Sequence, residues 1–394
     1  MAKLNKSFPN VGPENDAEDS LHVSELLGSM ELNESNAEIP IAIGRGEDER
    51  INIQDLSLLS HILIGGAVAS GKSVLLNSII LSLLRRKNPD EVKLLLIDPK
   101  MIEYGQYNCL QDNYLLKIPK VQSIVTSANE TKTALEFLAH EMDYRYQLLE
   151  TTKSRNLKDY NLNATMKSQI PYIVVCFDEY ADLVLMDGKD IEDSVIRLAQ
   201  KGSEVGIHLI IATQHISSLV IPERVSANFP TRIALRTVSC IDSKIIIGRN
   251  GAEQLNGKGE MLFSSQGKAY RMQGAMVLPD DIDQICNKIV NFQQNNNLYS
   301  NNGGSNSTES SVACSLSIVK PSPIFVEAAT FAVQSGKVTI SSLQRGLSIS
   351  YSKAGKIMEW LEETGIVERA QGGKFHRVLV DSVDIEEIIK RMND

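Results

Sequence analysis

Eight consecutive residues combine glycines, a lysine and a serine at a spacing suited to holding phosphate groups. They fit the pattern G-x-x-x-x-G-K-[ST] and are Gly66, Ala67, Val68, Ala69, Ser70, Gly71, Lys72 and Ser73. Glycines let backbone N–H groups turn towards phosphate oxygens, and the start of a following helix adds partial positive charge. We expect Lys72 to reach the β and γ phosphates and the Ser73 hydroxyl to ligate Mg²⁺. With an apolar run before the loop and a helical pattern after it, the context predicts an ATP site and not a chance match.

A second set of candidate catalytic residues follows two other apolar runs. Asp178 and Glu179 come directly after the run 172–177. We expect Asp178 to hold Mg²⁺ directly or through water, and Glu179 to polarise the water that attacks the γ-phosphate. Gln214 follows the run 208–213 and is a candidate sensor of the γ-phosphate, although polar residues are common at strand tips. Asp98 ends another run and is either a carboxylate of the site or a capping or turn residue.

The order of apolar and amphipathic segments predicts the elements that position these residues. Strands are expected over 39–43, 51–53, 62–64, 92–97, 172–177, 208–213, 231–236, 260–263 and 269–273, and helices after Ser73, over 128–150 and over 190–204. Alternating strands and helices predict an α/β fold with a doubly wound, mostly parallel sheet. Ligands bind at the carboxyl ends of the strands in such sheets, which is where all the candidates above fall.

Composition divides the 394 residues into parts. Residues 1–38 carry eight acidic residues against two lysines, so we expect a largely disordered segment, with a short helix over 21–33. The Asn/Ser/Gly-rich stretch within 291–320 predicts a flexible linker. Between them lies the nucleotide-binding domain, 39–290. A second domain, 321–381, and a tail, 382–394, for which a helix is one option, complete the chain.

Other features exclude whole classes of protein. No apolar run approaches the ~18 residues of a membrane span, and the N-terminus lacks a signal sequence, so we expect no membrane segment and a cytoplasmic location. The five cysteines contain no CxxC pair and indicate neither disulfides nor zinc. The net charge of −9 gives no global nucleic-acid footprint, so any DNA contact must be local.

The second domain has the pattern of a winged helix. Helices are expected over 324–334, 339–347 and 350–364, followed by a wing of two strands, 366–369 and 374–379. Eight basic and five acidic residues between 320 and 380 make this part positive in an acidic chain. This plan predicts binding of double-stranded DNA, with the second or third helix in the major groove. The alternative is a winged helix that contacts protein.

Several strings in the chain resemble the FtsK/SpoIIIE family of DNA translocases. In the first domain they are Gly66–Ser73, Leu96–Met101, Asp178–Leu183, Arg197–Lys201, Gly206–His208 and Ala212–Gln214, and in the winged helix Ser342–Arg345, Ile349–Tyr351 and Gly365–Val367. The resemblance implies a RecA-like P-loop ATPase motor that assembles as a homo-hexamer around double-stranded DNA. It also implies that the winged helix reads oriented DNA sequences. The candidate DNA-binding residues are Arg345, Ser352, Lys353, Lys356, Glu359 and Lys374.

The sequence also departs from the family pattern. The arginine that members use across the subunit interface falls on Ser203, and the arginine after Ala-Thr-Gln falls on His215. Lysines of the DNA-facing loops fall on Ser226 and Cys240, and the winged-helix asparagine and arginine readers fall on Ser352 and Lys356. An arginine finger contributes orders of magnitude to phosphoryl transfer, and lysine loses bidentate recognition of guanine. Members usually carry a membrane domain before the motor, which we do not expect here.

Three functions are compatible with these residues. The leading one is an ATP-driven translocase on double-stranded DNA. The second is a nucleotide-gated DNA-binding factor in which loss of the interface arginine has reduced motor activity. The third is a coupling ATPase that recruits a substrate to a DNA-transfer or secretion channel.

Overall fold

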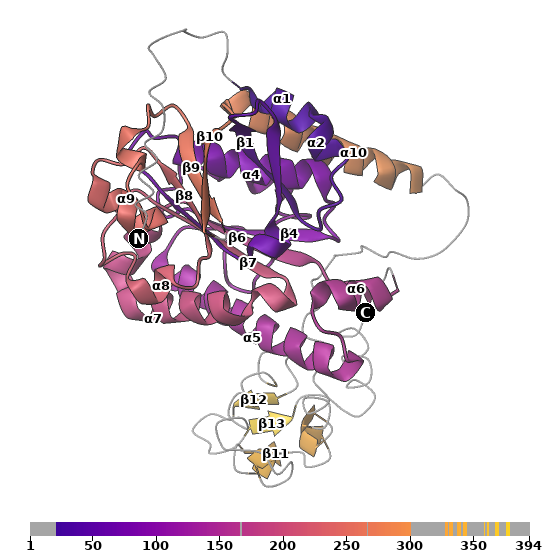
Figure 1. The fold of residues 1–394 in the computed structure, drawn as a ribbon. Coiled ribbons are helices and arrows are strands. Elements are labelled where there is room, and N and C mark those ends of the chain that lie inside the picture. Colours follow the sequence, from indigo (N-terminus) through magenta and orange to yellow (C-terminus); the bar gives the residue numbers. More distant parts are fainter. Residues whose placement is uncertain are drawn as a thin grey trace. The chain divides into compact units, whose positions relative to one another are not determined.

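The structure is a computed structural model that describes residues 21–165, 168–265 and 267–300, apart from the side chains of 186, 187 and 291–300 (Figure 1). In the C-terminal part it describes short stretches within 328–378. The chain divides into two compact units, residues 1–308 and 309–394, which are treated separately here.

The first unit is built on a ten-stranded sheet in the order β2-β1-β10-β9-β8-β3-β7-β6-β4-β5. Its strands are β1 (Pro40–Gly46), β2 (Ile51–Asp55), β3 (Ile62–Gly65), β4 (Val92–Ile97), β5 (Ile124–Val125), β6 (Tyr172–Phe177), β7 (Ile207–Thr213), β8 (Thr231–Leu235), β9 (Glu260–Ser265) and β10 (Lys268–Gln273). The six strands from β8 to β5 are parallel. The other pairings are antiparallel. For β1–β2 and β9–β10 the reason is that their short connections leave no room for a crossover. The predicted α/β fold with a mostly parallel sheet is confirmed.

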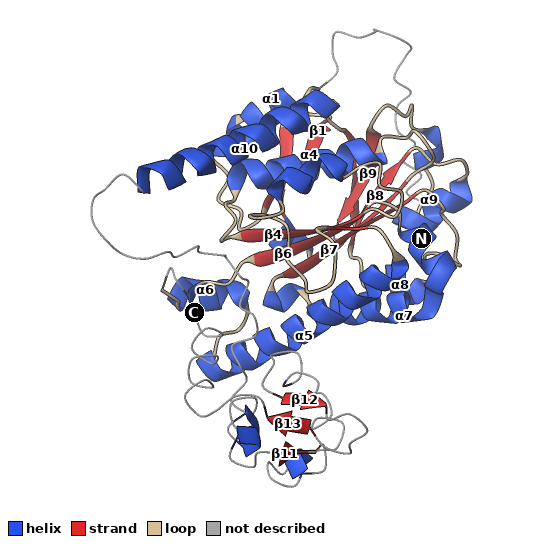
Figure 2. Cartoon of the chain, turned by 180° about the vertical axis from the view of Figure 1, so that it is seen from behind, coloured by secondary structure: helices blue, strands red, loops and turns tan. Residues whose placement is uncertain are grey.

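Helices cover both faces of this sheet (Figures 1 and 2). They are α1 (Val23–Gly28), α2 (Met30–Asn33), α3 (Leu56–Leu59), α4 (Lys72–Arg86), α5 (Ala128–Thr152), α6 (Leu157–Asn163), α7 (Tyr180–Lys201), α8 (Glu223–Ser226), α9 (Cys240–Ile247) and α10 (Pro279–Ser300), with 3-10 turns η1 (Gly105–Leu110), η3 (Ser203–Val205) and η4 (Ala252–Gln254). Helices α1, α4 and α10 lie on one face, and α5, α7 and α8 on the other. The central strands β3, β4, β6 and β7 are buried along their whole length, as a sheet covered on both faces requires.

Three expected boundaries differ from the structure. Residues 21–38 belong to the folded unit, since Leu21, Leu26 and Leu32 are buried in its core, so the domain begins before residue 39. Helix α7 begins at Tyr180, ahead of the expected 190–204. Asp187-Gly188 has the composition of a turn, but buried residues on both sides of it continue one helix. Helix α10 runs to Ser300, ten residues into the expected linker.

The described part of the second unit contains a small antiparallel sheet in the order β11-β13-β12. Its strands are β11 (Lys337–Val338), β12 (Val367–Arg369) and β13 (His376–Val378). The wing strands predicted over 366–369 and 374–379 therefore pair as expected, and β11 adds a third strand that the sequence did not indicate. Residues 328–329, 331–333 and 342–344 are helical, within the first two predicted helices.

Among the residues that the structure describes, no helix combines the length and apolar composition needed to cross a bilayer.

Candidate active site

The loop Gly66–Ser73 connects β3 to α4 and is tightly packed against the neighbouring strands. Gly71 has a φ of +105°, and a Cβ atom there would lie 3.0 Å from the Cα of Gly259. A Cβ on Gly66 would lie 2.6 Å from Ser70 Oγ. The Ala67 N–H donates to the Arg236 carbonyl at 2.8 Å, which fixes the loop to the end of β8. Only glycine fits at both positions, so the backbone has the compact curvature that a phosphate cradle needs.

Lys72 is the first residue of α4 and its side chain points into this loop. Its ammonium group donates to the carbonyl oxygens of Gly66 at 2.8 Å and Ala67 at 2.9 Å. Burial lowers the pKa of Lys72, and the nearby carboxylates of Glu179 and Asp178 oppose that shift. The loop thus carries its positive charge on the inner side of the turn.

Ser73 and Asp178 meet at the carboxyl edge of the sheet. The Ser73 Oγ lies 3.5 Å from Asp178 Oδ1, and the Asp178 N–H donates to the Ile97 carbonyl at 3.1 Å. Burial raises the pKa of Asp178 to about 7, and the carboxylates of Glu103, Asp98 and Glu179 contribute. A hydroxyl beside a carboxylate is an oxygen donor set that suits Mg²⁺, which commonly takes one or two protein ligands and completes its shell with water and phosphate oxygens.

Glu179 is held by the tip of the neighbouring strand β7. Its side chain accepts a hydrogen bond from Thr213 Oγ1 at 2.6 Å and from the Gln214 N–H at 3.2 and 3.0 Å. Glu179 is 2% exposed, so its orientation is set by the sheet and not by solvent. The arrangement places a fixed carboxylate next to the phosphate loop.

Asp98 organises the turn that follows β4. Its Oδ2 accepts hydrogen bonds from the N–H groups of Glu103 at 2.9 Å and Tyr104 at 3.0 Å, and the residue is fully buried. Of the two readings of Asp98, the geometry favours the turn residue. Its charge still acts on the site through Asp178.

The structure therefore brings Gly66–Ser73, Asp178, Glu179 and Gln214 together at one edge of the sheet. Ser203 lies apart from them. It begins η3 before the amino end of β7, and the seven residues of that strand span about 20 Å. The candidate DNA-binding residues Arg345, Ser352, Lys353, Lys356, Glu359 and Lys374 lie outside the described residues.

Arg224 and Arg232 are both engaged in contacts within the first unit. Arg224 pairs with Glu192 at 2.6 Å and with Asp193 at 2.9 Å. Arg232 donates to the carbonyl oxygens of Phe229, Ser226 and Ile246. Both residues hold α8 and its surroundings in place.

Sequence reasoning missed the roles of two residues in this site. Thr213 orients Glu179, and Lys100 forms an ion pair with Asp182 at 3.4 Å beside Asp178. Both stand inside strings that the sequence singled out, since Thr213 precedes Gln214 and Lys100 is two residues after Asp98. The pairing of β6 with β4 and β7 was needed to show that Thr213 contacts Glu179 and that Lys100 contacts Asp182.

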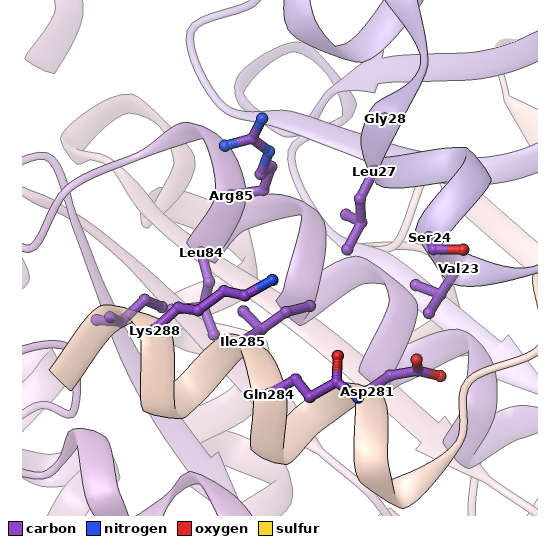
Figure 3. A pocket seen from close by; sticks show the side chains of 11 residues that line it. Val23, Ser24, Leu27, Gly28, Leu84, Arg85, Asp281, Gln284, Ile285 and Lys288 are labelled. Atoms are coloured by element: carbon purple, nitrogen blue, oxygen red, sulfur yellow. The ribbon is translucent and has the colours of Figure 1, made fainter. Parts of the chain in front are cut away.

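A separate groove of about 490 Å³ lies between α1, α4 and α10 (Figure 3). Leu27, Leu84 and Ile285 are among the residues that line it, with Arg85 and Lys288 at its rim. It adjoins the C-terminal end of α4, and the 15 residues of that helix span about 22 Å. The groove is therefore distinct from the phosphate loop at the N-terminal end.

Comparison with known proteins adds two family matches. Residues 22–218 match the FtsK/SpoIIIE family, and residues 320–381 match the Ftsk gamma domain. The chain is 38% identical to a DNA translocase FtsK from Chlorobaculum tepidum, covering 90% of this chain and 45% of that protein. It is 36% identical to the DNA translocase FtsK of Haemophilus influenzae, covering 89% of this chain and 70% of that protein. It is also 36% identical to the DNA translocase SftA of Bacillus subtilis, covering 92% of this chain and 37% of that protein. The chain thus spans less than half of two of these relatives.

Two solved structures resemble about two thirds of this chain. One is the pCW3 conjugation coupling protein TcpA with ATPγS, at a TM-score of 0.57 and 25% identity over 66% of this chain and 72% of that one. The other is the cytoplasmic domain of the Type VII secretion ATPase EccC from Thermomonospora curvata, at a TM-score of 0.56 and 19% identity. This match covers 68% of this chain and 34% of that one. The second likeness concerns the fold alone.

Proposed function

Because the chain belongs to the FtsK/SpoIIIE family, we propose that it hydrolyses ATP and uses the energy to move along double-stranded DNA. The observation that carries the proposal is the buried, strand-held Glu179 beside the phosphate loop. A carboxylate fixed in that position is what activation of a water molecule for γ-phosphate attack requires. Family membership then supplies the coupling to DNA.

The roles of the individual residues follow from their contacts. Gly66–Ser73 would hold the triphosphate through backbone N–H groups, with Lys72 as the cation at its β and γ phosphates. Ser73 and Asp178 would hold Mg²⁺, which when bound neutralises phosphate charge. Glu179 acts as the general base, and its hydrogen bond to the Gln214 backbone ties it to the strand whose tip faces the nucleotide.

The match of residues 320–381 to the gamma domain supports DNA as the partner. Basic residues in that segment would contact DNA phosphates and bases, and Lys353 and Lys356 are the candidates in the third predicted helix. We propose, on the family relationship, that the working form is a homo-hexameric ring around the duplex. The similarity to a conjugation coupling protein keeps a coupling ATPase as the second candidate. The gamma-domain match favours the translocase.

The test is steady-state ATP hydrolysis with and without long duplex DNA, together with displacement of a triplex strand from a linear DNA. DNA should stimulate hydrolysis by roughly tenfold or more, and E179Q should abolish it while retaining ATP binding. Slow hydrolysis that ignores DNA, combined with tight binding of both ATP and DNA, would replace the translocase by a nucleotide-gated DNA-binding factor. Hydrolysis stimulated by a protein substrate and not by DNA would favour the coupling ATPase.

A further inference from the structure

Lys100 is a second lysine at the carboxyl edge of the sheet, on the side of β4 and β6. Its ammonium group lies 3.4 Å from Asp182 Oδ2, in the first turn of α7. The side chains of Lys100 and Asp182 are 36% and 30% exposed. The pair is therefore open to solvent on one side, and such pairs are weak enough to be exchanged for another partner.

The turn that carries Lys100 is held by hydrogen bonds to Asp98. The buried Asp98 side chain accepts hydrogen bonds from Glu103 and Tyr104, and the Met101 N–H donates to the Asp98 carbonyl at 3.1 Å. Met101 itself has a φ of +57°, a conformation that a side-chain-bearing residue rarely adopts. Strained residues of this kind persist where surrounding contacts fix them, and they cluster at functional sites. The long side chain of Lys100 thus extends from a hydrogen-bonded turn.

The charge of Lys100 acts on both principal groups of the active site. Burial lowers the pKa of Lys72, and the Lys100 ammonium adds to that lowering. Burial raises the pKa of Asp178, and Lys100 opposes that rise. The geometry agrees, because the Asp178 N–H donates to the carbonyl of Ile97, three residues before Lys100, at 3.1 Å, and Asp182, the ion-pair partner of Lys100, lies one helical turn after Asp178.

Carboxylates outnumber lysines around the site. Five carboxylates surround the site, against the two lysines 72 and 100, and they are Asp98, Glu103, Asp178, Glu179 and Asp182. On its other side the phosphate loop contacts backbone groups, since the Ala67 N–H donates to the Arg236 carbonyl at 2.8 Å and the Gly259 N–H donates to the Ser70 carbonyl at 3.3 Å. Position 203, where the family pattern has an arginine, holds a serine.

We propose that Lys100 exchanges Asp182 for the γ-phosphate of the nucleotide bound to its own subunit, and so distinguishes ATP from ADP. Asp182 is then the counter-ion that keeps Lys100 in place when no γ-phosphate is present. Lysine suits this role because it is a compact charge on a flexible stem. The inference rests on the proposed function, since it assumes that the loop Gly66–Ser73 binds ATP.

The test compares the dissociation constants of ATPγS and ADP, with Mg²⁺, by calorimetry on the full chain. K100Q should weaken ATPγS binding by about tenfold and ADP binding by less than about twofold, because only ATPγS carries a γ-phosphate. K100R should restore most of the discrimination. The matched control is K132Q. It breaks an ion pair of similar length, 3.3 Å between Lys132 of α5 and Asp190, which lies on α7 like Asp182, and it should change neither dissociation constant.

D182N separates the proposal from a purely structural ion pair. It frees Lys100, so ATPγS should bind as tightly as to the wild type or more tightly. Equal losses of ATPγS affinity in K100Q and D182N, or equal losses for ATPγS and ADP in K100Q, would overturn the assignment. If the wild type binds neither nucleotide, the proposed function fails. If it binds both and K100Q leaves their ratio unchanged, only this inference fails.

Discussion

The backbone N–H of Gln214 donates to both carboxylate oxygens of Glu179, at 3.2 Å to Oε1 and 3.0 Å to Oε2. Thr213 adds a hydrogen bond from its hydroxyl to Oε1 at 2.6 Å. The end of β6 and the tip of β7 are therefore one unit. A movement of the β7 tip on loss of the γ-phosphate would therefore reorient Glu179 directly. In this way Gln214, the expected sensor of the γ-phosphate, would act on the general base through its backbone N–H.

Thr213 should matter for turnover more than for binding. T213V removes the hydroxyl that donates to Glu179 and leaves the carboxylate with the Gln214 N–H alone. We expect kcat for ATP hydrolysis to fall by roughly tenfold while ATP affinity stays unchanged, since the phosphate loop is untouched.

The matched control for this prediction is T231V. Thr231 is a buried strand threonine that donates to the Leu59 carbonyl at 3.3 Å, away from Glu179. Its turnover should match the wild type. Equal losses in both variants would mean that the effect comes from the fold and not from Glu179.

Gly71 should be essential for nucleotide binding. An alanine there combines a left-handed φ with a Cβ at 3.0 Å from the Gly259 backbone, so G71A must distort the phosphate loop. We expect ATP affinity to fall by more than about tenfold, measured by fluorescence of a nucleotide analogue.

G248A provides the comparison for Gly71. Gly248 also has a positive φ, +72°, but a Cβ there meets nothing within 4 Å. G248A should lower stability by about 1 kcal/mol and leave ATP affinity unchanged. Normal binding by G71A would contradict the assigned geometry of the loop.

The pKa of Asp178 predicts how stability depends on pH when metal is chelated. The pKa of the folded carboxyl is about 7 and the ordinary pKa of an aspartate is 3.8, so the folded state holds the proton more tightly. The cost of ionising Asp178 is therefore absent below about pH 4, grows as pH rises, and is complete above about pH 7. D178N should raise the melting temperature at pH 8 on the order of 5 °C, and have little effect at pH 4.

Asp55 should change stability with pH in the opposite direction to Asp178. Burial alone would raise its pKa, but hydrogen bonds from Ser57, Glu38 and Ile39 lower it overall. Its carboxylate thus stabilises the fold above pH 4 and loses that contribution as pH falls through its own pKa. D55N should lower the melting temperature at pH 8. Melting curves that move the same way for D178N and D55N would refute the assigned environments.

Two ion pairs with the same i,i+4 spacing should differ sharply in their effect on stability. Arg145 is 1% exposed and donates to Glu141 at 2.7 Å and to the Val205 carbonyl at 2.9 Å. R145A leaves a buried carboxylate unpaired, so we expect a loss of about 3 kcal/mol or more in urea unfolding. The Arg155 side chain is 88% exposed in its pair with Asp159, and R155A should leave the midpoint unchanged.

The second unit should determine DNA contact and not ATP chemistry. A chain that ends at residue 308 keeps the whole first unit. Its ATP affinity should match the full chain, while its affinity for duplex DNA should fall and become less steeply dependent on salt concentration. K353Q with K356Q in the full chain should reproduce part of that loss. An unchanged salt dependence in both proteins would favour a protein-contacting winged helix.

Several parts of the site were predictable because they depend on local pattern. The phosphate loop has a fixed spacing, and Asp178 and Glu179 follow a continuous apolar run that must be a buried strand. A resemblance to the FtsK/SpoIIIE family, carried by strings such as Leu96–Met101, was confirmed by the two family matches. The start of α7 was missed because Asp187-Gly188 has turn composition, and only burial on both sides keeps the helix continuous.

What the sequence by itself determined is therefore the fold class, the order of its elements and the residues at the carboxyl ends of the strands. The tertiary structure decided which of those ends are neighbours. β6 lies between β4 and β7 although 74 residues separate Ile97 from Tyr172, and this order sets Thr213 against Glu179 and Lys100 against Asp182. No local pattern contains that information, because the pairing of parallel strands is fixed by how the helices pack on both faces of the sheet.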